Sequence, residues 1–314
     1  MQRARVVTLN AALGPLDYRV PDGMAVEPGS IVVAPLGPRQ LLGVAWEADR
    51  LPTSEVPDQR LRPLAAVLDV RPIAAPLRRL CEWTADYYLA PLASVLRMVL
   101  PSSAALDGPR QLTEYRPTGL TPERMTPQRA KALAGIAGRQ GTIRELAAHA
   151  GVSDTVMRGL VHAGALEAVA VDSDRPLPCP DPDFAPPDLN ADQREAAASL
   201  AAAVGHGFDP VLLDGVTGSG KTEVYFEAIA ETIRKRRQSL ILMPEIALTA
   251  QFLDRFALRF GVRPAEWHSE LGARKRARTW NAVAAGEANV VVGARSALFL
   301  PYADLGLIVI DEEH

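Results

Sequence analysis

The stretch VLLDGVTGSGKTEVYF, residues 211–226, decides the fold class. Its first three residues are apolar and predict a short buried strand, and the residues from Glu223 onward predict an amphipathic helix. The glycine-rich turn between them matches the pattern G-x-x-x-x-G-K-[ST]. Strand, glycine loop and helix in this order predict a RecA-like α/β lobe of a P-loop NTPase, built on a parallel sheet.

The loop residues suit the binding of ATP with Mg²⁺. Glycines let the backbone curl so that its N–H groups point at phosphate oxygens, and the helix start adds its positive end. Lys221 is expected to reach the β- and γ-phosphates, and the Thr222 hydroxyl to ligate Mg²⁺. The predicted nucleotide-binding residues of this loop are Gly215, Gly218, Ser219, Gly220, Lys221 and Thr222.

A second motif is a run of acidic residues that begins at Asp311, directly after the apolar run LIVI, residues 307–310. The run predicts a buried parallel strand, and ligands of open α/β sheets bind at the carboxyl ends of such strands. Asp311 is therefore expected to hold Mg²⁺, and Glu312 to orient and deprotonate the attacking water. Without the glycine loop upstream, the same acidic residues would be typical of a solvated turn.

Two further strands are predicted at residues 240–243 and 290–292. The segments after them carry Thr249, Arg295 and Ser296, which suit contacts with the phosphates of a DNA strand, although an ordinary polar loop is the alternative. Gln193, near the start of this lobe, has an amide that can both donate to and accept from an adenine edge. A helix cap with a surface glutamine is the other interpretation of that segment.

Upstream of the lobe the chain divides into three parts. Residues 1–105 predict short strands in a small antiparallel sheet or barrel. Residues 106–172 predict helices with helix-turn-helix spacing, typical either of a winged-helix module on DNA or of a helical packing domain. Residues 173–188 are a proline-rich linker, and residues 189–314 form the nucleotide-binding lobe.

Composition excludes several classes of protein. With 48% hydrophobic and 23% charged residues, the 314-residue chain is typical of a folded globular protein. We expect no membrane span or secretory signal, and a cytoplasmic location. Two distant cysteines argue against a disulfide framework or a zinc site here. A net charge of −3 means that any contact with DNA would use local basic patches.

Taken together, the motifs carry a resemblance. The segments GVTGSGKTEVY (215–225), PEIALT (244–249), GARSALF (293–299) and DEEH (311–314) resemble those of the primosomal replication-restart helicases, the PriA family of superfamily 2. In the first domain LDY (16–18), PLG (35–37) and WTADYY (83–88) are similar to its domain that binds a nascent 3′ end. The GARS segment departs from the family, with Ala294 where threonine is usual.

The resemblance implies an ATP-dependent DNA helicase that recognises stalled or D-loop-like forks and starts primosome assembly. It also implies a 3′-end pocket formed by Asp17 and Gly37, with Arg62 as its basic contact. A fork-binding adaptor without ATPase activity, which recruits replication proteins, is the alternative.

Further properties of the family would apply to a longer protein. Its members continue into a second lobe with ATP-site arginines and into a zinc-binding insertion, so these 314 residues are expected to be a truncated portion that binds ATP with little turnover. Expected partners are DNA, single-stranded DNA-binding protein and primosome proteins, with no membrane.

Overall fold

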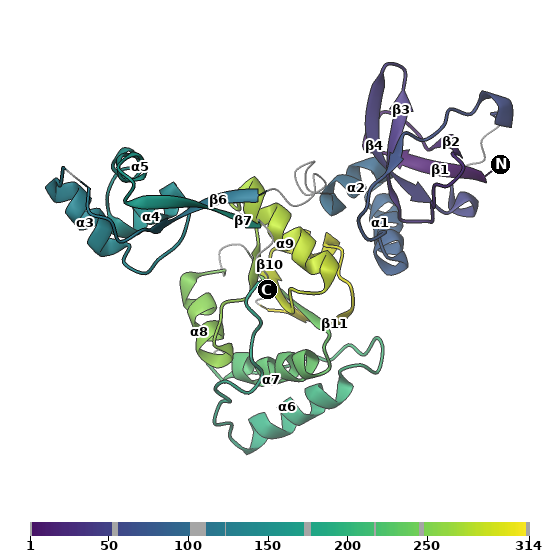
Figure 1. The fold of residues 1–314 in the computed structure, drawn as a ribbon. Helices are drawn as coiled ribbons and strands as arrows, with labels where there is room; N and C mark the ends of the chain where they lie inside the picture. Colours follow the sequence, from purple (N-terminus) through teal and green to yellow (C-terminus); the bar gives the residue numbers. More distant parts are fainter. Residues whose placement is uncertain are drawn as a thin grey trace. The chain divides into compact units, whose positions relative to one another are not determined.

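The computed structural model describes residues 2–51, 56–100, 111–122, 124–172, 177–216, 218–244 and 248–311. It separates into two compact units (Figure 1). Unit one combines Met1–Leu106 with Pro176–His314, and unit two is Asp107–Arg175. The predicted amino-terminal domain and nucleotide lobe therefore belong to one unit, although unit two lies between them in the sequence.

The amino-terminal part of unit one is an antiparallel sheet, as predicted. Its strand order is β2-β1-β4-β3-β5, and β1 and β4, inside the sheet, each carry a continuous run of buried residues. The last strand is much shorter than residues 61–70, where the apolar pattern places it. The strands are β1 (Gln2–Thr8), β2 (Leu16–Val20), β3 (Ile31–Leu36), β4 (Arg39–Trp46) and β5 (Ala66–Val67), with 3₁₀ turns at Ala48–Arg50 and Asp58–Arg60.

Two helices follow this sheet, α1 (Ala75–Tyr87) and α2 (Leu92–Val99). The first helix ends at Tyr87, and Pro91 is the residue that precedes α2, because proline suits a helix start but not a helix interior. The second helix was not predicted. Its apolar face contributes to the largest core of the protein, which also contains residues of α1 and of the lobe.

Unit two has its own hydrophobic core, formed by residues such as Ile136, Leu146 and Met157. Its predicted helix pair is present, and the Thr142–Glu145 capping box at the start of α4 is confirmed. Its elements are β6 (Gln111–Pro117), α3 (Pro127–Gly135), α4 (Ile143–Ala150), α5 (Asp154–His162) and β7 (Leu166–Asp172), with β6 and β7 paired antiparallel.

The nucleotide lobe is an α/β structure on a parallel sheet of order β11-β8-β10-β9, as the sequence predicts. Strands β8 and β10 are almost wholly buried and carry the apolar runs identified in the sequence. The elements are α6 (Ala191–Ala203), α7 (Lys221–Arg234), β8 (Gln238–Leu242), α8 (Ala250–Phe260), β9 (Ala265–Trp267), α9 (Ala273–Ala285), β10 (Val290–Gly293), the 3₁₀ helix η4 (Arg295–Phe299) and β11 (Leu305–Ile310).

One strand prediction in the lobe is wrong, and the predicted burial of a second strand is wrong. Residues 211–213 form no strand, and Val211 and Leu212 are 52% and 90% exposed. β11 is formed, but Ile308 and Ile310 are 44% and 59% exposed rather than buried. Among the described residues β11 pairs with β8 alone. A short apolar run is buried only where neighbouring elements cover it, and local sequence does not specify those neighbours.

A shared core joins α2 to the lobe. Leu96 and Val99 of α2 belong to the same buried cluster as Phe299 and Leu300. The indole Nε1 of Trp280, on α9, donates a buried hydrogen bond of 2.7 Å to the carbonyl of Val99. The helix α2 thus contacts the lobe through apolar packing and through the hydrogen bond of the Trp280 indole.

Residues 177–188 of the predicted linker pack along the lobe. Asp181 N–H donates to Phe260 O at 3.0 Å, and Ala185 N–H donates to Arg259 O at 3.3 Å. Arg234 of α7 also forms an ion pair with Asp183 at 2.6 Å. This part of the linker therefore packs on the lobe without forming a helix or strand. Proline suits such a segment because it fixes φ and has no backbone N–H to donate.

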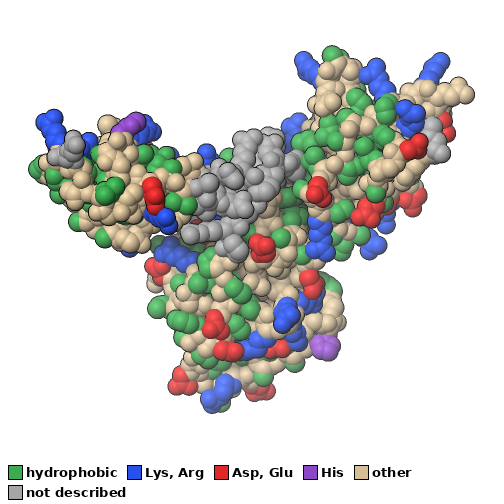
Figure 2. Space-filling model, viewed as in Figure 1, with side chains coloured by type: hydrophobic (Ala, Val, Ile, Leu, Met, Phe, Trp, Pro, Cys, Tyr) green, Lys and Arg blue, Asp and Glu red, His purple; other side chains and the backbone are tan. Residues whose placement is uncertain are grey.

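The surface drawn in Figure 2 has basic and acidic side chains interspersed, in keeping with the net charge of −3. No described helix has the length and the apolarity needed to cross a bilayer. Within the described ranges no three His, Cys, Asp or Glu side chains form a group that could hold a metal.

Candidate nucleotide and DNA site

The glycine loop before α7 has the backbone of a phosphate-binding turn. Gly218 and Gly220 have φ values of +82° and +84°, the left-handed region that favours glycine. A Cβ on Gly220 would also lie 2.4 Å from Nε2 of Gln193. Since α7 begins at Lys221, the positive end of its dipole faces this loop. The loop conformation and the helix start together suit an anion.

Lys221 lies against the loop that precedes it. Its Nζ donates to the carbonyls of Gly215, at 2.5 Å, and Val216, at 3.2 Å. The ammonium group is thereby held on the inside of the turn, close to the backbone that would surround a phosphate. The contact of Lys221 with the β- and γ-phosphates stays a prediction.

Asp311 is positioned at the end of β11 by two hydrogen bonds. Its backbone N–H donates to Leu242 O at 2.9 Å, which joins it to the end of β8. Its carboxylate Oδ2 accepts a hydrogen bond of 2.7 Å from the phenol of Tyr225. Because Tyr225 lies on α7, this bond joins the end of β11 to the helix that begins at the glycine loop.

Tyr225 is the site residue that the sequence reasoning missed. It lies three positions after Thr222 in α7, on the same helix face. Burial, followed by the Asp311 charge, raises the pKa of Tyr225 above its ordinary value, so the phenol stays protonated and donates. In the sequence, the position of Tyr225 three residues after Thr222 could have indicated that it lies near the site.

The donor set fits a magnesium ion bound together with a nucleotide. Thr222 and Asp311 offer hard oxygen ligands, and the bond between Asp311 and Tyr225 joins Asp311 to the helix that carries Thr222. Mg²⁺ is usually held by one or two such ligands plus substrate phosphates, so no all-protein cage is required. Glu312, the predicted general base, lies outside the described residues.

Gln193 contacts the glycine loop directly. Its Oε1 accepts from Asn190 N–H at 3.0 Å, which completes the capping box of α6. Its Nε2 donates to Ser219 O at 2.9 Å. The helix-capping interpretation is therefore confirmed, and a contact between Gln193 and adenine stays a prediction.

The predicted DNA-contacting residues follow the carboxyl ends of neighbouring strands. Met243 N–H donates to Gly293 O at 3.1 Å, so the segments after β8 and β10 start side by side. Thr249 caps α8 by accepting from Phe252 N–H, while Arg295 and Ser296 begin η4. The hydroxyl of Thr249 already accepts the capping hydrogen bond of α8. Arg295 is charged and exposed, and is therefore the best placed of the three residues to contact a phosphate.

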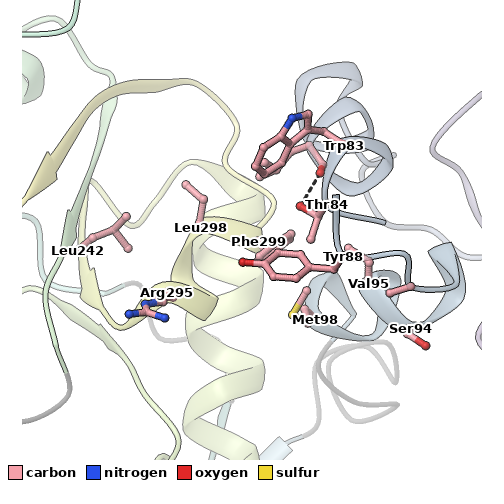
Figure 3. A pocket seen from close by; sticks show the side chains of 12 residues that line it. Trp83, Thr84, Tyr88, Ser94, Val95, Met98, Leu242, Arg295, Leu298 and Phe299 are labelled. Atoms are coloured by element: carbon pink, nitrogen blue, oxygen red, sulfur yellow. Dashed lines mark hydrogen bonds between the residues drawn. The ribbon is translucent and has the colours of Figure 1, made fainter. Parts of the chain in front are cut away.

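An apolar pocket of about 480 Å³ adjoins Arg295 (Figure 3). Figure 3 shows the ring of Tyr88 next to Met98 and Phe299, with Trp83 further along α1. Trp83 and Tyr87 are stacked, with ring centroids 5.0 Å apart, and both are exposed. The helix after the amino-terminal sheet and the η4 segment therefore line one cavity.

Two of the three predicted 3′-end residues lie together. Gly37 and Pro38 form the two-residue turn between β3 and β4, and Nη1 of Arg62 donates to Gly37 O at 3.2 Å. Burial raises the pKa of the nearby Tyr18, and the positive charge of Arg62 opposes that shift. The hairpin tip and Arg62 are exposed and form one basic edge of the domain.

The third residue, Asp17, does not present a free carboxylate. It pairs across strands with Arg5, whose Nε lies 2.8 Å from Oδ1, and Arg3 approaches Oδ2 at 3.2 Å. The side chain of Asp17 is fully buried, and that of Arg5 is 6% exposed. Strand alternation turns Asp17 away from the face of Tyr18 and towards the arginines of β1, so its carboxylate is engaged within the domain, and its contact with a 3′-hydroxyl stays a prediction.

The comparisons with known proteins agree with this division of the chain. Residues 5–101 match the 3′ DNA-binding domain (3′BD) family, and residues 190–314 match the DEAD/DEAH box helicase family. The fold and the site thus define a protein of the helicase class with a DNA-binding domain before its nucleotide lobe.

Curated relatives narrow the class to one family. The chain is 30% identical over its whole length to the replication restart protein PriA of Rickettsia felis, where it covers 38% of that protein. It is 32% identical to that of Haemophilus influenzae, over 95% of this chain and 42% of the relative. The chain belongs to the PriA family, and it spans about two fifths of the length of these relatives.

Proposed function

We propose that this chain is the fork-binding and ATP-binding part of an ATP-dependent DNA helicase of replication restart. The observation that carries the proposal is the assembly around α7, where the glycine loop, Thr222 and Asp311 converge. Lys221 and the loop amides would hold the phosphates, and Mg²⁺ would neutralise charge on them when bound with the nucleotide. Residues 1–314 contain one lobe and are expected by themselves to bind ATP with little turnover.

The DNA side of the proposal rests on two places. The β3–β4 hairpin tip with Arg62 would receive the 3′ end of a nascent strand, and Arg295 would contact a phosphate near the nucleotide lobe. Support comes from the exposed positions of these side chains and from the match of residues 5–101 to a 3′ DNA-binding domain.

Unit two is proposed to be a winged-helix module that adds a contact with the fork. Its helix pair is joined through Gly151 in the left-handed conformation, and α5 exposes Thr155, Arg158 and His162 along one face. Family resemblance extends the proposal to single-stranded DNA-binding protein and primosome proteins as partners, to a zinc site elsewhere in the longer protein, and to the cytoplasm as location.

The nucleotide assignment is tested with Lys221→Ala. We expect the affinity for a fluorescent ATP analogue with Mg²⁺ to fall at least tenfold, since one charge-assisted contact to phosphate contributes about 1.5–3 kcal/mol. The matched control is Lys275→Ala, which removes an exposed lysine from α9 and is expected to leave the affinity unchanged. Equal affinities for Lys221→Ala and the parent chain would refute the phosphate-loop assignment.

A further inference from the structure

Tyr225 is a buried polar side chain that joins two elements of the nucleotide site. It is 5% exposed, and its ring packs edge-on against Phe226 at 5.3 Å between centroids. Packing therefore fixes the ring, while the hydroxyl reaches the Asp311 carboxylate at 2.7 Å. A phenol at this depth requires a partner, and the partner here is the residue expected to hold magnesium.

Tyr225 also lies one helical turn after Thr222, the other expected magnesium ligand. Its hydroxyl thus connects the first turns of α7 to the end of β11, across 86 positions of the sequence. If Tyr225 only filled the core, a phenylalanine would suffice at this position. The hydroxyl adds orientation, because a hydrogen bond to Oδ2 restricts rotation of the carboxylate.

We propose that Tyr225 is a positioning residue for magnesium, which orients Asp311 through its hydroxyl before the metal binds. The proposal rests on the proposed nucleotide function, since it assigns a supporting partner to that site. Partners of this kind usually change metal affinity by about 10–100-fold when they are removed.

The test compares Tyr225→Phe with the parent 314-residue chain. Binding of a fluorescent ATP analogue is titrated first in EDTA and then at increasing Mg²⁺. We expect the affinity in EDTA to stay within about twofold, because Lys221 and the loop amides are untouched, while the Mg²⁺ concentration at half effect rises roughly tenfold. If Tyr225 only supported the fold, the Tyr225→Phe substitution would change both the titration in EDTA and the Mg²⁺ titration, or would change neither.

The matched control is Tyr302→Phe. Tyr302 is also a largely buried tyrosine of unit one, and its hydroxyl donates to Ala297 O at 3.1 Å, away from Asp311. We expect this variant to lose a comparable hydrogen bond and to keep the parent Mg²⁺ titration. Thermal denaturation of both variants checks that they fold alike.

The outcomes separate the two proposals. A Tyr225→Phe chain whose Mg²⁺ titration overlays that of the parent overturns the positioning role and leaves nucleotide binding intact. A parent chain that binds no nucleotide at any Mg²⁺ concentration overturns the proposed function, and the positioning role with it. An equal shift in the Tyr302→Phe chain would also overturn the specific role of Tyr225.

Discussion

At the scale of single residues, Asp17 shows how a plausible binding residue can be a structural one. Its carboxylate is fully buried between Arg5 and Arg3, and removing one partner of a buried ion pair usually costs about 3–5 kcal/mol. We predict that Asp17→Asn lowers stability by about 3 kcal/mol, measured by urea-dependent hydrogen exchange of β1 and β2. Asp58→Asn is the control, because Asp58 pairs with Arg3 while 63% exposed and should contribute no more than about 1 kcal/mol. Equal losses in the two variants would contradict the buried pair as the main role of Asp17.

At the scale of elements, the β3–β4 hairpin decides where a DNA end could bind. Its tip is a two-residue turn with Gly37 at φ +61°, and Arg62 reaches the carbonyl of that glycine. We predict that Arg62→Ala weakens binding of a fork with a nascent 3′ end about 3–10-fold at fixed salt, since one phosphate-type contact is lost. Arg79→Ala, at an exposed position of α1, removes the same charge elsewhere on the domain and should have a smaller effect. If both variants weaken binding equally, the hairpin makes only a nonspecific contribution.

At the scale of the whole molecule, the core shared by α2, α9 and η4 is expected to couple DNA binding to nucleotide binding within unit one. A ligand at 100 times its dissociation constant stabilises the folded state by about 2.7 kcal/mol. We predict that saturating Mg²⁺ and ATP slow hydrogen exchange in the lobe and also in α2, because Val99 is bonded to Trp280. The core of unit two is separate and serves as the internal control. Protection confined to the lobe, with α2 unchanged, would show that the shared core does not transmit the effect.

Much of the fold could be predicted because its signals are local. The alternating residues of Leu16–Val20 form β2, and the capping residues Thr142 and Asn190 mark the starts of α4 and α6. Such signals work because a cap or an alternating strand is stabilised by residues within a few positions. The helix α2 was missed, since eight residues after a proline give too short a pattern to recognise.

The site was predicted in part for the same reason. The glycine loop, Lys221 and Thr222 are contiguous, so their chemistry could be assigned from the sequence, and Asp311 could be placed by the rule for strand ends. The ion pair of Asp17 could not be predicted, because the pairing of β1 with β2 places Arg5 directly opposite it. Arg5 is twelve residues away in the sequence, and no local pattern indicates such a cross-strand neighbour.

The sequence by itself therefore determined the class of lobe, the phosphate loop and the antiparallel character of the first domain, all of which depend on neighbouring residues. Only the tertiary structure decided that Tyr225 meets Asp311, that α2 shares a core with the lobe, and that residues 211–213 are exposed. These features depend on contacts between residues far apart in the chain. Burial and side-chain pairing are properties of the packed elements, and a local pattern specifies an element without specifying its partner.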